Sequence, residues 1–342
     1  FLDDNFLITN ETGKRIFNAV KDLPVIDPHN HADVKEIADN NCYSNAWQLF
    51  AATDHYVWEL LRKRGVPEEL ITGKADPRSK FLAMAKVFPE TAGNPLYEWI
   101  HLDLRRYFGI DLLLNEENGP KIWEEVNAKL ATDAFRPQAL LTGPLNVEAM
   151  SSTDDLIDTL ENHDRANKAF GRTLIRPTWR PDKAMKIFAP GWRDYIGQVE
   201  KRFDMKIETL SDLLDATKKS HDFFAEHGCR ASDHGIEYPV RADYRFEDAD
   251  AAFRKALSGK ELTQEETDCY MGTFLAEAAA LNAETGWVTQ LHIGAVRDVR
   301  KTLFDALGPD VGGDVSSHFI DYTRPLATLL NRFDGKLKVV LY

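Results

Sequence analysis

The feature that most constrains this chain is a short run near its start, Pro24-Val25-Ile26-Asp27-Pro28-His29-Asn30-His31-Ala32-Asp33. Val25 and Ile26 are apolar and β-branched, which is typical of a buried parallel strand, and the polar residues begin where such a strand would end. If the chain stays extended, the two-residue period points the imidazoles of His29 and His31 to one side, with their Cα atoms about 6–7 Å apart. That spacing suits two nitrogens that bind one divalent metal ion. A pair of surface histidines after a turn is the alternative, and this stretch alone does not decide between them.

Strand-like segments recur later in the chain, with helical patterns such as 154–169 and 210–226 between them. This alternation predicts a parallel α/β fold, and strand ends that carry His, Arg and Asp favour a (β/α)8 barrel over a Rossmann sheet. The sequence has no G-x-G-x-x-G or P-loop pattern that would support nucleotide binding. Besides the first strand, five are expected, at 147–152, 173–176, 227–232, 287–293 and 336–342.

The interval between the first and second expected strands is long and contains no convincing strand. Its helices are expected at 47–63, 78–87, 95–107 and 120–130, each punctuated by Gly or Pro. Such an interval is an inserted helical layer rather than a simple crossover. We therefore divide the chain into an N-terminal helix with the first strand (1–36), a helical insertion (37–141) and the remaining barrel strands (142–342).

Composition excludes several classes of partner. The 342 residues are 43% hydrophobic, enough for a large core, and the net charge of −13 argues against nucleic acid or an anionic membrane. No apolar run approaches the ~18 residues of a membrane-spanning helix. The three cysteines are widely spaced, so a disulfide framework is not expected and a reducing cytoplasm fits best. The first residue is not Met, and the sixth strand runs to the last residue, so we expect a trimmed chain that lacks the last barrel strands.

Charged and aromatic side chains gather at further strand ends and in one loop of the insertion. Arg180 follows one strand, Asp233 and His234 follow the next, and His292 and Arg297 follow a third; the segment 54–58 (DHYVW) lies in the insertion. Taken singly, each of these residues is more simply explained as a member of a salt bridge or as a hydrogen-bonded polar group of the core. Together they stand where barrel enzymes keep their active sites. A metal, arginines that bind carboxylates and proton-transfer groups indicate chemistry on a small hydroxy acid or sugar acid.

Seven stretches along the chain carry a further signal: they are PVIDPHNHAD, ATDHYVWELLRKRGV, GNPLYEWIHLDLRRYFGI, LIRPTWRPDKAM, ASDHG, WVTQLHIGAVRD and GKLKVVLY. In these stretches and in their order, the sequence resembles a known family along essentially its whole length. The family is uronate isomerase (glucuronate isomerase) of the amidohydrolase superfamily. The resemblance implies a distorted (β/α)8 barrel that interconverts D-glucuronate with D-fructuronate and D-galacturonate with D-tagaturonate through a cis-enediol.

On the metal side, the resemblance implies that His29 and His31 hold one divalent metal ion, commonly zinc. Asp233 and His292 would line the same side of the site. The family also has an Asp near the last barrel strand, which completes the metal site, with an Arg close behind it and a late Trp-Trp-Phe stretch. None of these lies within residues 1–342, so the resemblance favours a fragment of a longer protein.

On the substrate side, the resemblance implies that Tyr56 moves a proton between the C1 and C2 oxygens, with His55 beside it. Arg180 and Arg297 would bind the substrate. A hexuronate is then the partner of a cytoplasmic homo-oligomer. Two other functions stay open: a hydrolase of the same superfamily that activates water with its metal, and a non-catalytic sensor of sugar acids.

Overall fold

The computed structural model describes residues 2–3, 5–316 and 319–342. The chain is a mixed α/β protein with parallel strands, and it divides into two compact units. The first unit is mainly helical. The second contains the longest strands and the helices that cover them. Unit 1 comprises Phe1–Ile26, Asp39–Glu148 and Arg297–Asp314, and unit 2 comprises Asp27–Ala38, Ala149–Val296 and Val315–Tyr342.

The helices of the first unit begin where polar side chains cap them. Asn10 accepts a hydrogen bond from the Gly13 N–H, as expected for the cap of the first helix, and Asp54 accepts from the N–H groups of Tyr56 and Val57. This second cap explains why the segment 47–63 is two helices and not the one we expected. The helices are α1 (Glu11–Val20), α3 (Ala46–Phe50), α4 (His55–Lys63), α5 (Pro77–Val87), α6 (Pro95–Arg106), α7 (Gly119–Leu130), α8 (Pro137–Thr142) and α15 (Lys301–Leu307).

The helical interval between the first two strands is as the sequence predicts. The structure describes every residue of 37–141 and has no strand there. The apolar faces of its helices share one core, in which Phe81 and Met84 are fully buried and the Phe81 and Trp123 rings lie 5.3 Å apart. Burying a large apolar side chain contributes about 1.5–3 kcal/mol, so this core is a main source of stability for the helical layer.

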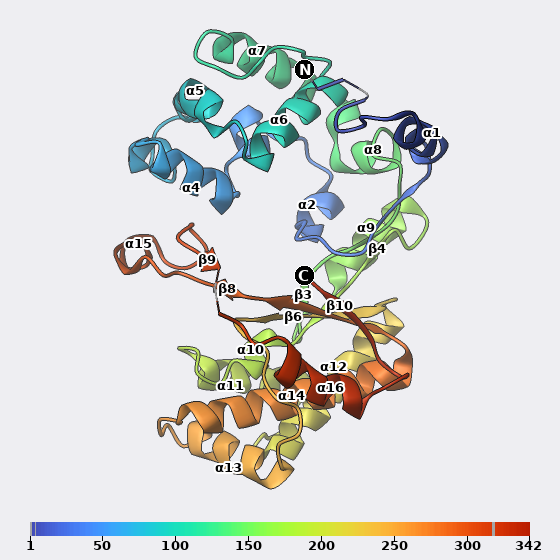
Figure 1. Cartoon of the computed structure of the whole chain (residues 1–342), viewed down its shortest axis with the longest axis vertical. Helices are drawn as coiled ribbons and strands as arrows, with labels where there is room; N and C mark the ends of the chain where they lie inside the picture. Colours follow the sequence, from blue (N-terminus) through green and yellow to red (C-terminus); the bar gives the residue numbers. More distant parts are fainter. Residues whose placement is uncertain (1, 4, 317–318) are drawn as a thin grey trace. The chain divides into compact units, whose positions relative to one another are not determined.

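The second unit contains a five-stranded sheet with the order β10-β7-β6-β5-β3, in which every neighbouring pair is parallel. Figure 1 shows the larger helices of this unit gathered on one side of the sheet. The strands are β3 (Asp154–Asp155), β5 (Trp179–Arg180), β6 (Ala231–Ile236), β7 (Val288–Ile293) and β10 (Lys338–Leu341). The helices are α2 (Val34–Asp39), α9 (Glu161–Phe170), α10 (Asp182–Met185), α11 (Trp192–Phe203), α12 (Leu210–Glu226), α13 (Phe246–Leu257), α14 (Gln264–Thr285) and α16 (Thr323–Arg332).

The remaining strands form two smaller sheets. One has the order β1-β2-β4, formed by β1 (Val25–Asp27), β2 (Val147–Ser151) and β4 (Ile175–Arg176), and the other pairs β8 (Ala295–Val296) with β9 (Val315–Ser316) antiparallel. β2 leads into β3 and β4 into β5 after breaks of two residues. The hydrogen bonding continues across the breaks, because the Ser152 N–H donates to the Arg176 carbonyl (3.0 Å) and the Asp154 N–H to the Thr178 carbonyl (2.9 Å).

The expectation that β1 is buried is wrong. Val25 is 46% exposed and Ile26 is 70% exposed. β1 is an edge strand, since β2 is its one neighbour in the order of that sheet among the described residues. Burial of a β-branched pair depends on what covers the strand, and the sequence of the strand alone does not show that.

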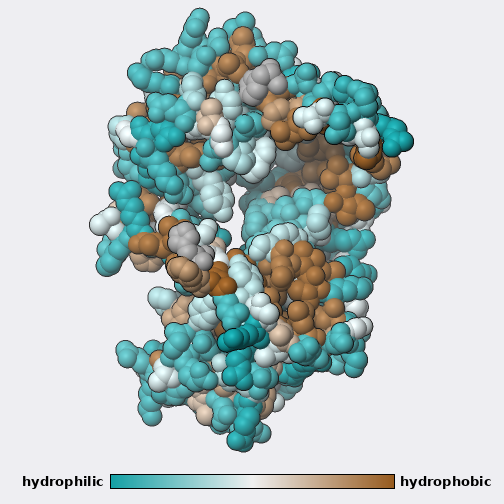
Figure 2. All heavy atoms as spheres, in the orientation of Figure 1, coloured by the Kyte–Doolittle hydropathy of each residue, from teal (hydrophilic) through white to brown (hydrophobic). Residues whose placement is uncertain are grey.

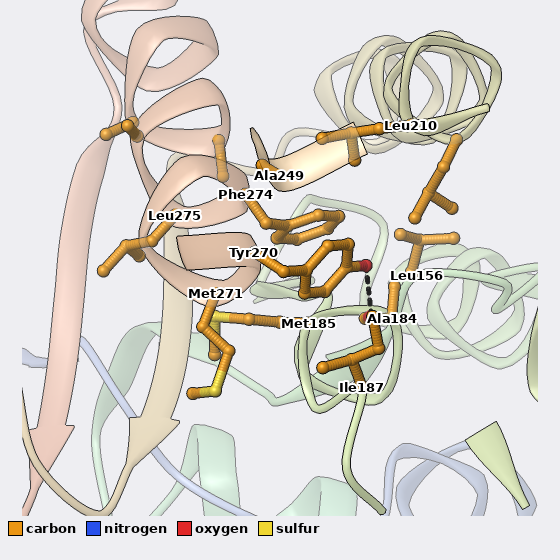
Figure 3. Close-up of a cluster of buried hydrophobic side chains, with 14 of the residues drawn as sticks. Leu156, Ala184, Met185, Ile187, Leu210, Ala249, Tyr270, Met271, Phe274 and Leu275 are labelled. Atoms are coloured by element: carbon orange, nitrogen blue, oxygen red, sulfur yellow. Dashed lines mark hydrogen bonds between the residues drawn. The ribbon is translucent and has the colours of Figure 1, made fainter. Parts of the chain in front are cut away.

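The core of the second unit lies between its sheet and its helices. Figure 3 shows Tyr270 and Phe274 of α14 at its centre, packed against side chains from α10, α12 and α13. The Tyr270 hydroxyl donates a hydrogen bond of 2.8 Å to the Ala184 carbonyl, which satisfies the polar group of a fully buried ring. The helices are thereby fixed behind the strands whose ends carry the candidate site.

Two expected boundaries are wrong for local reasons. The strand expected at 227–232 begins later, at Ala231, because α12 continues to Glu226 and Gly228, with φ +87°, turns the chain before β6. The helix expected at 154–169 begins at Glu161, because residues 154–155 form β3. The short strands β3, β5, β8 and β9 were not expected from the sequence. The strands expected at 147–152, 173–176, 287–293 and 336–342 correspond to β2, β4, β7 and β10 within about two residues.

The face of the molecule in Figure 2 is mostly hydrophilic, with hydrophobic side chains gathered in a few patches. Large apolar residues near the end of β10 are among the exposed ones, including Leu341 at 52% and Tyr342 at 49%. Among the described residues, no helix has both the length and the apolar character needed to cross a membrane.

Candidate active site

Five of the eight candidate residues lie together in the second unit, at the carboxyl ends of parallel strands. His29 and His31 follow β1, Arg180 ends β5, Asp233 lies in β6 and His292 lies in β7. In the β6–β7 register Asp233 is opposite Gln290 and Gly235 is opposite His292, so the chemistry-bearing side chains meet at one end of the sheet. This is the end at which α/β enzymes place their active sites.

The loop that carries the two histidines is fixed by hydrogen bonds at its start. Asp27 accepts from the His29 N–H (3.2 Å) and from the Asn30 side-chain amide (3.0 Å). The Asn30 N–H donates to the Ser151 carbonyl (3.0 Å), and the Thr153 hydroxyl donates to the Asn30 carbonyl (2.9 Å). The backbone of Asn30 is thus held against the end of β2. The imidazoles of the two flanking histidines lie together on the other side.

The imidazoles of His29, His31 and His292 converge. The Nε2 atoms of His29 and His31 lie 3.2 Å apart, and the ring centroids of His29 and His292 lie 4.5 Å apart. Desolvation of its ring and the neighbouring His29 lower the pKa of His31. A lowered pKa favours the neutral imidazole, which is the form that ligates a metal.

Asp233 is the carboxylate at the centre of the cluster and is completely buried. Its oxygens lie 3.1 Å from Arg180 Nη1 and 3.3 Å from His292 Nε2. Neither oxygen accepts a well-aligned hydrogen bond from the described residues. Burial raises the pKa of this carboxyl, and the Arg180 charge opposes that rise.

The donor set fits a divalent metal ion. His29, Asp233 and His292 each offer a ligand atom, and these atoms all lie within 4.8 Å of one another. Two imidazoles with one carboxylate suit zinc, and the buried carboxylate oxygens without aligned donors are the kind of group that a cation would satisfy. His31 reaches this group of three through its Nε2 contact with His29.

Three further residues support the cluster and were not identified from the sequence. The Gln290 Oε1 atom accepts a hydrogen bond from His29 Nδ1 (3.2 Å), and the Gln290 side-chain NH2 group donates to the Pro28 carbonyl (3.0 Å). The Tyr342 ring lies 4.6 Å from that of His292. The third residue is Asp182, beside Arg180. Gln290 could have been found, because it precedes His292 by two residues and so shares its face of β7.

The other three candidates, His55, Tyr56 and Arg297, all belong to the first unit. His55 and Tyr56 begin α4, with ring centroids 4.3 Å apart. Arg297 forms an ion pair with Asp314, and Tyr56 lies close enough to interact with it electrostatically. His55 Nε2 is buried and has no hydrogen-bond partner in the described part of the chain. The phenol and imidazole of two consecutive residues thus lie near the guanidinium of Arg297, which is distant from them in sequence.

The fold and these residues define an α/β enzyme whose polar centre lies at the carboxyl ends of parallel strands, with imidazole, carboxylate and guanidinium groups in contact. Comparisons with known proteins place it within this class. A sequence model of the glucuronate isomerase family matches residues 1–342. The chain therefore belongs to the glucuronate isomerase family, and it is an isomerase.

Relatives with known sequences or structures agree. The chain is 48% identical to the uronate isomerase of Thermotoga maritima over 342 residues, which cover 100% of this chain and 75% of that protein. The uronate isomerase of Oceanobacillus iheyensis is 38% identical and is covered over 73% of its length. The crystal structure of the Thermotoga maritima enzyme superposes with a TM-score of 0.96. That of glucuronate isomerase from Caulobacter crescentus, 26% identical, superposes with a TM-score of 0.94 and is covered over 74% of its length.

Proposed function

We propose that this chain interconverts D-glucuronate with D-fructuronate and D-galacturonate with D-tagaturonate, with one bound divalent metal ion, zinc. The observation that carries the proposal is the group formed by His29, Asp233 and His292, with Arg180 against the carboxylate. Membership of the glucuronate isomerase family supports it and does not favour the hydrolase alternative.

In this proposal His29 and His31 hold the metal, with Asp233 and His292 on the same side. A zinc ion held there would act as a Lewis acid toward the carbonyl and hydroxyl oxygens of the sugar. The burial of Asp233 strengthens electrostatic effects at its carboxylate, because few water dipoles remain there to screen them.

The reaction moves one hydrogen from C2 to C1 and one proton between the two oxygens, so the formula of the sugar does not change. We assign the oxygen-to-oxygen transfer to Tyr56, whose hydroxyl interacts electrostatically with Arg297. The C2 proton needs a base. Asp233 is the first carboxylate to test for that task, because it is a buried carboxylate at the centre of the cluster, beside His292 and Arg180.

Substrate binding is assigned to Arg180, Arg297 and His55. A guanidinium binds a carboxylate through two parallel N–H groups and stays charged at any working pH. The uronate carboxylate distinguishes these sugars from neutral hexoses, so the arginines give the site its substrate class.

For the architecture we propose a distorted (β/α)8 barrel. The successive neighbours β1, β2 with β3, β4 with β5, β6, β7 and β10 supply six of its strands. In that barrel 1–36 and 142–342 form the wall and 37–141 the insertion. We place the enzyme in the cytoplasm as a homo-oligomer, which agrees with its few, widely spaced cysteines.

The test is a ketose assay on D-glucuronate and D-galacturonate, with a dihydropyrimidine and a simple amide as competing substrates. We expect ketose from the uronates, loss of activity after chelation and recovery with zinc. Hydrolysis of the amide without ketose formation would contradict the proposed isomerisation and identify the protein as a hydrolase. Binding of uronates without any turnover would make the protein a sensor.

A further inference from the structure

One buried carboxylate beside the site has no role in the scheme above. Asp182 is 5% exposed and begins α10, two residues after Arg180. Its Oδ2 accepts hydrogen bonds from Arg180 Nε (3.0 Å), from the Gly235 N–H (3.0 Å) and from Lys186 Nζ (3.3 Å). Burial alone would raise the pKa of Asp182, but the charges of Lys186 and Arg180 outweigh it and lower the pKa. Asp182 is therefore an anion that three donors hold in place.

Arg180 connects this anion to the centre of the site. Its Nε bonds to Asp182, and its Nη1 lies 3.1 Å from an oxygen of Asp233. A guanidinium is planar and rigid, so fixing the direction of Nε also fixes the direction of Nη1. The position of Asp182 thus determines how Arg180 meets Asp233.

This arrangement needs space beside the backbone of β6 at Gly235. A residue with a Cβ at that position would displace its neighbours. A Cβ at Gly235 would lie 2.6 Å from Arg180 Nη2 and 3.1 Å from Asp182 Oδ2. The first distance is shorter than real Cβ contacts, so the guanidinium would have to shift. Gly235 also donates its N–H to Asp182, which means that the same residue supplies both the space and a hydrogen bond.

We propose that Asp182 is a positioning residue for the isomerisation: it holds Arg180 against Asp233 and so sets the direction of the carboxylate that faces His29 and His292. The proposal rests on the function proposed above for this cluster. The competing explanation is that Asp182 only ties the end of β5 to β6 and stabilises the fold. The two explanations differ in whether Asp182 acts through Arg180.

A double-mutant cycle separates them. Asp182→Asn keeps the size and one acceptor oxygen of the side chain, and Arg180→Met removes the guanidinium. Loss of one charge-assisted hydrogen bond corresponds to about a 10- to 100-fold effect, so Asp182→Asn alone should lower kcat by that factor, with a smaller change in KM. In the Arg180→Met background the same change should lower kcat less than about 3-fold, since the partner through which it acts is gone.

Zinc affinity of the metal-stripped protein provides a second readout that needs no turnover. Asp182→Asn should weaken zinc binding several-fold when Arg180 is present and have little effect in Arg180→Met. If the unchanged protein does not isomerise uronates, the proposed function fails, and the zinc cycle still decides the role of Asp182. Gly235→Ala is the second variant, should Asp182→Asn not fold; its Cβ should displace Arg180 and produce the same losses.

The matched control is Asp154→Asn. Asp154 is also a buried carboxylate, 8% exposed, and accepts from the Ser152 hydroxyl (2.7 Å) and the Thr178 N–H (3.1 Å) without contacting Arg180. Asp154→Asn should change zinc affinity by the same factor whether Arg180 is present or replaced by Met. Equal factors for Asp182→Asn in both backgrounds, in the kinetic and the zinc cycle, would reduce Asp182 to a structural residue and overturn the proposal.

Discussion

The Nε2 atoms of His29 and His31 lie 3.2 Å apart, although the two residues are separated by one asparagine. Two imidazole nitrogens at that distance either share a proton or face a common ligand. The Asn30 between them is held by Asp27 and by the end of β2, so the pair does not depend on its own contact for its orientation. The surrounding loop therefore sets the orientation of the pair, as the metal site proposed above requires.

Metal content tests this pair directly. Replacing either His29 or His31 by Ala should remove most bound zinc, because a site that loses one protein ligand holds the ion too weakly. Inductively coupled plasma analysis of the purified variants gives the stoichiometry. His227→Ala is the control, since His227 bonds to the Phe223 carbonyl (2.9 Å) away from the cluster. Full zinc occupancy in both single variants would contradict the assignment.

Arg297 should contribute to the use of uronates without contributing to metal content. Arg297→Met removes a charged group that contacts Asp314 and Tyr56. Loss of a charge-assisted pair costs about 1.5–3 kcal/mol, so kcat/KM should fall about 10- to 150-fold while zinc stays bound. Arg241→Met breaks a surface pair with Asp243 (2.9 Å) and should leave kcat/KM unchanged. An unchanged kcat/KM in Arg297→Met would assign that arginine to structure.

For Tyr56 the loss should appear in the rate and not in binding. A positioned acid or base contributes about 10²–10⁴-fold, so Tyr56→Phe should lower kcat by that order with a small change in KM. Tyr238→Phe removes a hydroxyl that bonds to Asp268 (2.8 Å) and serves as the matched control. Normal turnover by Tyr56→Phe would leave the DHYVW segment as a packing element of the helical layer.

Local chemistry explains which parts of the fold and site were predictable. Asp233 and His292 each lie at the carboxyl end of an expected strand, and the strand period of two places their side chains, so both could be proposed from the sequence. The division of 47–63 into α3 and α4 depends on Asp54 acting as a cap, and many aspartates in a helical pattern do not cap.

Tertiary contacts explain the rest. Val25 and Ile26 have the composition of a buried strand but are exposed, because burial depends on a neighbour that the strand does not encode. Asp182 is one of many acidic residues next to an arginine in sequence. Its three donors come together only when β5 and β6 pair, so its place beside Arg180 and Gly235 could not be read from spacing.

Acid stability should depend on His221, which is fully buried on α12 and stacks on Trp287 with ring centroids 3.8 Å apart. Burial lowers the pKa of His221 from 6.5 to about 4. Between these pH values the unfolded chain binds a proton that the folded chain does not, so the free energy of unfolding decreases as the pH falls. The contribution is complete above pH 6.5 and declines on acidification to pH 4. At 1.36 kcal/mol per pKa unit, it amounts to about 3 kcal/mol.

The measurement is urea unfolding at several pH values between 7 and 4, on the unchanged protein and on His221→Gln. The glutamine can still donate to Asn282, which lies 3.3 Å from His221 Nε2, but it does not titrate. The variant should therefore be less stable at pH 7, because it loses the stacked ring, yet its stability should fall less steeply below pH 6.5. Parallel pH profiles for the two proteins would mean that His221 takes up its proton equally in the folded and unfolded chain, and that another group causes the acid sensitivity.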